Sequence, residues 1–499
     1  MTDLIRWILG DQLGPHFLGT DDSPGDNGTE RVLIVEALDA FRRRRYHRAK
    51  AHLILSAIHH RAAELGDRAE FVRARSFRSA LEGRGDSLSV CAPTSWQGRR
   101  VAASLGIRML PARGFVTTQD EFASWSAGRR RLLLEDFYRD ARRRTGILMD
   151  DEQPVGGRWN FDAENRLPPP KGVARLPLPD AWRPVEDAID DEVRELMSRW
   201  ERDEGLEFGG SDGPRLFAAT RTEALAALED FITHRLTLFG PYEDASLSHD
   251  WVMAHSLLSA PLNLGLLHPQ EVIDRAVLAH DAGAAPLASV EGLVRQIMGW
   301  RDFVWHLYWH FGEGYVRDSN ALSAHEPLPD WFRDLDDEAV QARCLSSALR
   351  DVRSRGWNHH ITRLMVLGNW ALQRGYDPQE MTEWFTANYV DAYPWVMAVN
   401  SVGMALYADG GRMATKPYAA GGAYINRMSD YCKGCRYKPG VRVGETGCPF
   451  TAGYWWFLYR NRQRLSGNVR IAQPLRGLDR LSDREDVVAQ ETERGEAPP

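Results

Sequence analysis

The sequence contains no apolar run of the roughly 18 residues that a membrane span requires, and cysteine is scarce, with five in 499 residues. No amino-terminal segment resembles a signal peptide. These absences predict a cytoplasmic protein outside the membrane, in a reducing compartment where clustered cysteines more often bind metal than form disulfides. The chain is too long for one core of ordinary size, so we expect at least two domains.

Residues 1–146 also lack G-x-G-x-x-G, the usual dinucleotide fingerprint. They alternate short apolar runs with amphipathic stretches, as in VLIVEAL followed by RAKAHLILSAIHHRAAEL. Strands separated by helices predict an α/β domain with a parallel sheet. The first strand runs into Gly10, Asp11, Gln12 and Leu13, at the carboxyl edge where open α/β sheets usually hold ligands.

Beyond residue 215 the strand signal is nearly absent, and apolar residues recur at three and four positions, which predicts an all-α domain over 215–480. Residues 147–214 are rich in proline, glycine and charge, and we expect an interdomain linker there, with a helical stretch near 187–205. Residues 481–499 are charged and lack aromatics, which predicts a disordered tail. Nothing resembles a coiled coil or an extended apolar patch, so we expect a monomer.

Three of the five cysteines, Cys432, Cys435 and Cys448, lie in the run DYCKGCRYKPGVRVGETGCPF. A C-x2-C pair followed by a third thiolate can converge on one metal centre, which then lacks one ligand. Cys91 and Cys344 are the candidates for the fourth, and Cys344 lies in the same predicted domain. Spacing alone leaves zinc and a four-iron four-sulfur cluster open, and buried free thiols are the structural alternative.

The formal net charge of -7 argues against nucleic-acid binding through overall charge, but the distribution is uneven. Residues 411–470 carry eleven lysines and arginines against two acidic residues, a local net charge of +9. Such a segment can meet phosphates or balance the negative charge of a tetrathiolate cluster. A solvated basic face is the alternative.

Several side chains of the helical region suit acid-base or redox chemistry. His359 and His360 are adjacent, and a histidine that faces a polar cavity can donate a proton near neutral pH, although a hydrogen-bonded core histidine is the common case. Tyr418 and Tyr424 flank a glycine-rich bend that lets backbone approach a ligand closely. Many tryptophans lie here too; most should be core, and a few can relay electrons.

Together these segments resemble the iron-sulfur bacterial cryptochromes and photolyases, the prokaryotic 6-4 photolyase group. The resemblance rests on motifs spread along nearly the whole chain: GDQL, WNFDAEN, FGPYEDA, HSLLSAPLNLGLL, RQIMGWR, HHITRLMVLGN, TKPYAAGGAYINRMSDYCKGC and CPF. It implies an α/β antenna domain that binds 6,7-dimethyl-8-ribityllumazine, linked to an all-α domain that holds FAD and a 4Fe-4S cluster. The implied activity is light-driven repair of 6-4 pyrimidine dimers in UV-damaged DNA.

The resemblance also assigns roles by motif position. His360 matches the catalytic histidine that supplies a proton, His359 its neighbour, and Tyr418 and Tyr424 the tyrosines near the lesion. The implied cluster ligands are Cys344, Cys432, Cys435 and Cys448. The implied flavin contacts are Tyr242, His255, Ser256, Leu257, Ser259, Asn263, Gln296, Arg301, Asp391 and Asn400. The implied antenna contacts are Gly10, Asp11, Gln12, Leu13 and Glu36.

The chain departs from the family pattern where electrons would travel. Trp384 matches a relay tryptophan, but Asp336 stands where relatives carry another, and Phe385 stands where a tyrosine is frequent. Trp305 replaces a common arginine. Phenylalanine has no phenolic proton to lose on oxidation, so the usual route for reducing the flavin with light would be interrupted. Further departures surround the predicted site: Pro394, Gly421 and Ala423.

Three functions therefore compete. The first is a DNA photolyase, indicated by His360, the tyrosine pair and the basic segment. The second is a blue-light receptor of cryptochrome type with little or no repair, which the departures at 394, 421 and 423 favour. The third is an iron-sulfur nucleic-acid binder without flavin. An absorption spectrum with iron and sulfide analysis separates the third from the others.

Overall fold

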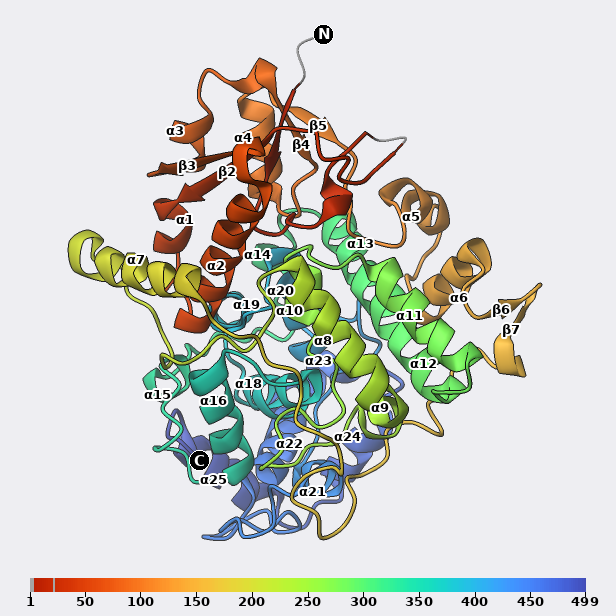
Figure 1. Cartoon of the computed structure of the whole chain (residues 1–499). Coiled ribbons are helices and arrows are strands. Elements are labelled where there is room, and N and C mark those ends of the chain that lie inside the picture. Colours follow the sequence, from red (N-terminus) through yellow and green to blue (C-terminus); the bar gives the residue numbers. More distant parts are fainter. Residues whose placement is uncertain (1–3, 21–22) are drawn as a thin grey trace.

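The computed structural model describes residues 4–20 and 23–499. Its amino-terminal part is a five-stranded sheet in the order β3-β2-β1-β4-β5, with every neighbouring pair parallel, as the sequence predicted. The strands are β1 (Ile5–Ile8), β2 (Val32–Ala37), β3 (Ala69–Ala74), β4 (Leu88–Cys91) and β5 (Arg108–Leu110). In Figure 1 this domain, red to orange, lies above the helical domain.

Alternating strand residues bury both faces of the sheet, because successive side chains of a strand point to opposite sides. Ile8, Val32 and Ile34 share a core with α2 (Arg48–Leu65). Trp7 and Leu33 pack on the other side, with α3 (Phe77–Leu81) and α4 (Trp96–Ser104). The remaining helices before residue 146 are α1 (Leu38–Arg42), α5 (Gln119–Ser126) and α6 (Leu134–Thr145).

The connection between the domains is mostly irregular and carries one long helix. It contains the short hairpin of β6 (Met149–Asp150) and β7 (Gln153–Pro154), and the helix expected near 187–205 is α7 (Ala188–Glu204). Asp187 caps α7 by accepting from the backbone N–H of Ile189. Val193, Met197 and Trp200 of α7 belong to the same core as α2, so the connection packs against the α/β domain.

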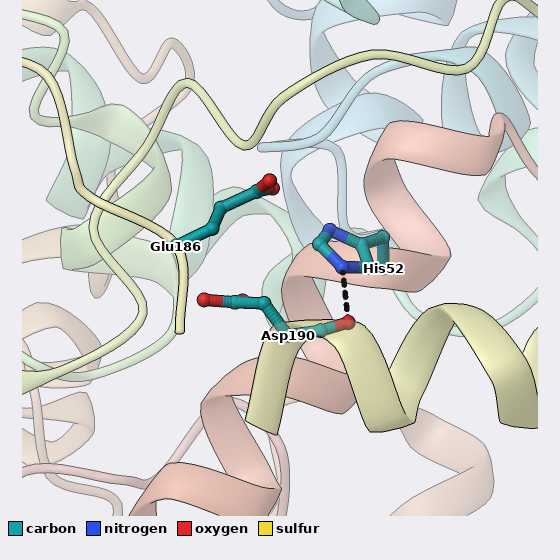
Figure 2. Close-up of side chains that lie close together, drawn as sticks. All are labelled: His52, Glu186 and Asp190. Atoms are coloured by element: carbon teal, nitrogen blue, oxygen red, sulfur yellow. Dashed lines mark hydrogen bonds between the residues drawn. The ribbon is translucent and has the colours of Figure 1, made fainter. Parts of the chain in front are cut away.

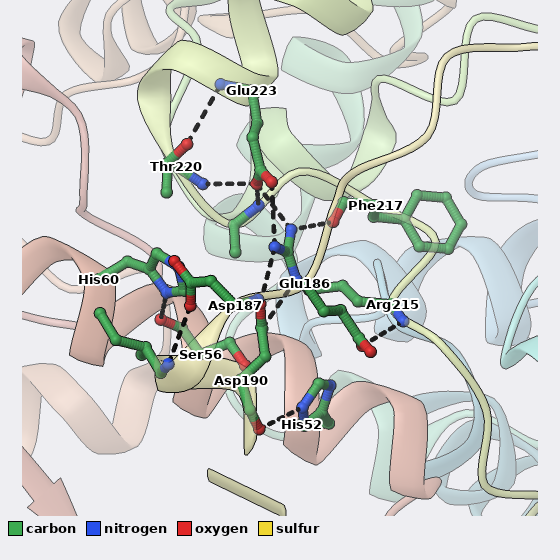
Figure 3. A network of polar contacts seen from close by, with 12 residues as sticks. His52, Ser56, His60, Glu186, Asp187, Asp190, Arg215, Phe217, Thr220 and Glu223 are labelled. Atoms are coloured by element: carbon green, nitrogen blue, oxygen red, sulfur yellow. Dashed lines mark hydrogen bonds and ion pairs between the residues drawn. The ribbon is translucent and has the colours of Figure 1, made fainter. Parts of the chain in front are cut away.

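A buried polar network fixes α7 between α2 and the first helix of the helical domain, α8 (Arg221–His234) (Figure 3). Arg215 donates to both carboxylate oxygens of Asp190, at 3.0 and 3.1 Å, and also pairs with Glu223. The side chains of Arg215 and Asp190 are 1% and 0% exposed. His52, Glu186 and Asp190 bring three potential metal ligands together, but Asp190 is occupied by Arg215 and His52 Nε2 bonds the backbone carbonyl of Asp190 (Figure 2). The cluster is therefore an ion-pair network.

We predict that Arg215→Ala lowers the free energy of unfolding by about 3–5 kcal/mol, because removing one partner leaves a buried carboxylate unpaired. Chemical denaturation measures this change. Arg194→Ala is the matched control, since Arg194 pairs with Glu186 and Asp212 nearer the surface and should cost about 1 kcal/mol or less. Equal effects of the two substitutions would contradict a structural role for the buried pair.

The rest of the described chain is helical, as predicted. Its helices are α8, α9 (Leu236–Tyr242), α10 (Ser259–Asn263), α11 (Pro269–Asp281), α12 (Leu287–Val294), α13 (Asp302–Phe311), α14 (Tyr315–Asp318), α15 (Asp330–Arg333), α16 (Arg343–Arg355), α17 (His360–Thr362), α18 (Asn369–Arg374), α19 (Pro378–Asn388), α20 (Pro394–Val399), α21 (Gly422–Met428), α22 (Pro449–Arg460), α23 (Arg462–Leu465), α24 (Ala472–Asp479) and α25 (Arg484–Arg494). No helix in the described ranges is both long and apolar enough to cross a membrane.

The prediction of a disordered carboxyl-terminal tail is wrong. Helix α25 packs on the body, where Glu491 is fully buried and pairs with Arg374 at 2.9 Å. Arg374 Nη2 also donates to the backbone carbonyl of Gly495. The tail has few apolar residues, so its composition predicted disorder. The contacts with Arg374 of α18 offset the conformational entropy that is lost when the tail is ordered.

Candidate functional site

A cavity of about 620 Å³ opens within the helical domain. Three π-helical segments supply part of its wall: Arg295–Arg301 between α12 and α13, Arg363–Gly368 between α17 and α18, and Asn400–Ala405 after α20. Such wide turns are rare and occur frequently at functional sites. Leu257, also in the wall, has a left-handed backbone with φ of 56°, which is strained for a leucine.

Thirteen residues that the sequence singled out line this one cavity. Nine were predicted flavin contacts and four were predicted catalytic residues. They are His255, Ser256, Leu257, Ser259, Asn263, Gln296, Arg301, Asp391, Asn400, His359, His360, Tyr418 and Tyr424. They come from segments up to about 170 residues apart, so only the fold brings them together.

An ion pair that the sequence reasoning did not single out organises the floor of the cavity. Both guanidinium Nη atoms of Arg363 donate to Asp391, each at 2.9 Å, and Ser259 Oγ donates to the same carboxylate at 2.7 Å. Burial alone would raise the pKa of Asp391, but Arg363 and Ser259 hold that pKa below its ordinary value. Arg363 lies inside the motif HHITRLMVLGN, three residues after His360, which was the available signal.

The cavity histidines are neutral in this state. Although His360 is exposed to the cavity, the surrounding wall desolvates its ring, and this desolvation, followed by the nearby Arg363 charge, lowers its pKa to about 4. His359 is buried, stacks on His255 with ring centroids 4.3 Å apart, and bonds Ser246 Oγ through Nε2 at 2.9 Å. Burial lowers the pKa of His359 well below its usual range and that of His255 to about 4. His360 therefore faces the cavity, whereas His359 is held by protein groups.

Three buried polar atoms of the wall have no hydrogen-bond partner among residues 4–20 and 23–499: His255 Nε2, His359 Nδ1 and Arg301 Nε. Unpaired buried polar atoms are costly and normally bond a ligand or water. The cavity thus suits a large ligand with hydrogen-bonding groups along its length. Its mouth carries Lys416, exposed, beside Tyr418 and Tyr424, both half-buried.

A second cavity, of about 550 Å³, lies between the α/β domain and the helical domain. Gly10, Asp11 and Glu36 line it, at the carboxyl ends of β1 and β2. Gln12 and Leu13 do not: Gln12 Nε2 donates to the backbone carbonyl of Cys91 at 2.9 Å, and Leu13 is core.

Lys50, which the sequence reasoning missed, also lines the interdomain cavity. It is 3% exposed, donates to the backbone carbonyl of Thr386 at 2.6 Å, and approaches the rings of Tyr46 and Tyr393. Burial lowers its pKa to about 7. Its place among the apolar residues of RAKAHLILSAIHH was a weak signal, because lysine stems often lie along apolar surfaces.

Two further predicted site residues, Tyr242 and Trp384, line neither cavity. Tyr242 ends α9 and packs against a small cluster around Leu247 and Met253. Trp384, on α19, lines a separate surface hollow and donates from Nε1 to the backbone carbonyl of Arg333 at 3.2 Å.

The four predicted cysteine ligands gather at one end of the helical domain. Cys344 lies in the first turn of α16, Cys448 caps α22, and Cys432 and Cys435 occupy the loop after α21. Burial raises the pKa of Cys344 well above its usual range, and the three other thiols raise it further. The amino-terminal ends of α16 and α22 favour a negatively charged group between them.

Cys91, the remaining cysteine, lies apart in β4, where Arg6 Nη1 approaches its sulfur at 3.4 Å. Of the sulfurs of Cys344, Cys432, Cys435 and Cys448, no three fall within 4.8 Å of one another within residues 4–20 and 23–499. Four sulfurs on a single zinc would lie about 3.8 Å apart, because each Zn–S bond is about 2.3 Å.

Comparison with known proteins decides the family. The chain is 41% identical to a (6-4) photolyase of Agrobacterium fabrum, over 97% of this chain and 96% of the relative. The chain belongs to the photolyase-related family. The profile described as deoxyribodipyrimidine photo-lyase-related protein matches residues 6–209. The resemblance read from the motifs is thereby confirmed.

Two solved structures share the photolyase fold. A bacterial class III photolyase from Agrobacterium tumefaciens superposes with a TM-score of 0.58 at 16% identity, covering 93% of this chain and 98% of that one. A cryptochrome from Synechocystis gives a TM-score of 0.56 at 13% identity, covering 96% and 99%. At these identities the likeness concerns the fold, and it confirms the predicted pairing of an α/β domain with a large helical domain.

Proposed function

We propose that this photolyase-family protein repairs 6-4 pyrimidine dimers in DNA with light, using FAD in the helical cavity. The observation that carries the proposal is the convergence of His360, Tyr418 and Tyr424 with the nine flavin-motif residues on one cavity. The name of the Agrobacterium fabrum relative supports the same activity. Bound FAD, when reduced and excited by light, supplies the electron for repair.

The residues of the cavity would bind the cofactor, fix the charges around it and supply the proton. The orphaned atoms His255 Nε2 and Arg301 Nε provide donors or acceptors for the cofactor's polar groups. The Arg363–Asp391 ion pair keeps one positive and one negative charge at fixed positions in the cavity wall. His360, exposed to the cavity, is the group placed to deliver a proton to a flipped-out base, and Tyr418 and Tyr424 lie at the mouth where such a base would enter.

We further propose a 4Fe-4S cluster on Cys344, Cys432, Cys435 and Cys448. In the described part of the chain no three of their sulfurs fall within 4.8 Å of one another, which does not match the ligand set of a single zinc ion, and the two helix amino termini suit a negatively charged centre. We propose a ribityllumazine antenna in the interdomain cavity, where Gly10, Asp11 and Glu36 line the wall. Residues 411–470 would hold the DNA backbone around the lesion.

Illumination of the reduced protein with an oligonucleotide that contains one 6-4 lesion tests the proposal. We expect light-dependent loss of the lesion, followed by chromatography, and none in the dark or with an undamaged strand. Flavin absorption in the purified protein, with iron and sulfide analysis, checks the cofactors independently. Flavin binding without any repair would instead support the cryptochrome-type receptor, and iron without flavin would support the nucleic-acid binder.

The structure weakens the sequence argument for the receptor. Gly421 and Ala423 do not line the helical cavity, and Pro394 lines the interdomain cavity instead. Ala423 is exposed on α21. These departures therefore leave the wall around His360 intact, which favours the photolyase.

A further inference from the structure

Four tryptophans form a continuous line of contacts from the helical cavity to the boundary between the domains. Trp395 lines the cavity, and its ring centroid lies 5.7 Å from that of Trp305. Trp305 lies 5.3 Å from Trp309, and Trp309 lies 4.5 Å from Trp96. These separations are those of aromatic rings in van der Waals contact.

The line crosses three helices and ends near solvent. Trp305 and Trp309 lie four residues apart on α13, so they share one face of that helix. Trp395 comes from α20, and Trp96 begins α4 of the α/β domain. Trp395 and Trp305 are 3% and 1% exposed, whereas Trp309 and Trp96 are partly exposed and Trp96 lines the interdomain cavity.

We propose that Trp395, Trp305, Trp309 and Trp96 are the relay through which light reduces the flavin of this protein. The inference rests on the proposed FAD site. With FAD bound, Trp395 would give one electron to the photoexcited oxidised cofactor, and each next tryptophan would refill the one before it. A thiolate reductant in solvent returns the electron to the exposed end and becomes a thiyl radical. The net change is one electron moved from thiolate to flavin, with no bond made in the protein.

Nearby charges favour this direction. The Arg301 guanidinium lies 5.2 Å from the Trp395 ring, and Arg99 lies 3.5 Å from the Trp309 ring. A positive charge beside an indole disfavours the radical cation on that ring. Arg301 therefore opposes return of the positive charge toward the cavity, whereas Arg99 raises the free energy of the radical cation on Trp309, so the charge does not rest on that ring.

Trp384, the relay residue that the resemblance implies, does not begin a comparable line of tryptophans in the described structure. Within the described residues its ring contacts are with Phe332, Phe385 and Tyr389, and none is with a tryptophan. Phenylalanine is far harder to oxidise than an indole. Asp336, where relatives carry a relay tryptophan, is exposed and has no ring.

The test compares Trp305→Phe and Trp309→Phe with Trp384→Phe and Trp370→Phe. Trp370 is a matched control, since it is 1% exposed and lies outside the line. The readout is the rate of flavin reduction under blue light with dithiothreitol and no oxygen, together with transient absorption of the tryptophan radical. We expect the first two variants to lose most of the rate and the radical signal, and the two controls to keep both.

Loss of reduction in Trp384→Phe, with wild-type rates in Trp305→Phe and Trp309→Phe, would overturn the relay. Flavin absorbance in every variant separates lost electron transfer from lost cofactor. Chemical reduction with dithionite bypasses the relay, so Trp305→Phe reduced in this way should repair lesions like the wild type. If Trp305→Phe loses flavin photoreduction but the wild-type protein does not repair lesions, the relay is supported and the photolyase proposal is contradicted. Purified wild-type protein that contains no flavin would contradict both proposals.

Discussion

The variant His360→Ala should lose most light-driven repair while it still binds flavin. A general acid contributes about 10²–10⁴-fold to a rate, and the same loss is expected here because alanine has no proton to deliver. The ring of His360 is exposed to the cavity, so its removal leaves the surrounding contacts in place. Lesion loss per absorbed photon measures the effect, and the flavin spectrum checks that the cofactor remains.

The control for this variant is His325→Ala, because His325 is an exposed histidine that lines neither cavity. It should repair at the wild-type rate. A His360→Ala protein that repairs as well as His325→Ala would show that another group, or water, supplies the proton.

The pH dependence of repair gives a second signature of His360. Burial and Arg363 lower its pKa to about 4 in the DNA-free protein, so the ring is neutral at pH 7. If DNA binds as proposed, its phosphates would bring negative charge near His360, which would favour the protonated form and raise this pKa. Only the protonated ring is a strong acid, so repair should fall as the pH rises through the pKa of the complex. His360→Ala should lack that step.

The variant Cys435→Ala should lose the proposed 4Fe-4S cluster and with it most of the fold of the carboxyl-terminal region. Cys432 and Cys435 lie in a loop that is only half-buried, whereas Cys344 and Cys448 are buried. A metal centre that joins them supplies folding energy directly, because the loop has little core of its own. We expect iron content near zero and insoluble or broadly unfolding protein, measured by iron analysis and thermal denaturation.

The chain offers a matched control in Cys91→Ala. Cys91 is also a buried cysteine, but it lies in β4, far from the four predicted ligands in sequence. This variant should keep its iron and flavin and lose only modest stability. A soluble, cluster-free and active Cys435→Ala protein would contradict a structural role for the centre.

Most residues of the helical cavity could be predicted from the sequence, but those whose role depends on a distant contact could not. The motifs located thirteen cavity residues, because each motif is a short local pattern. Gln12 and Leu13, which the GDQL motif also singled out, are buried and do not line the interdomain cavity. The motifs passed over Arg363, whose importance depends on its contact with Asp391, 28 residues away.

The sequence by itself determined the order of the two architectures, the parallel sheet and the family, because periodicity and motif chemistry are local properties of the chain. Only the tertiary structure decided the π-helical walls of the cavity, the docking of α25 through Glu491, and the line from Trp395 to Trp96. Each depends on side chains that are remote in sequence, and such contacts form only when the packed core brings their helices together.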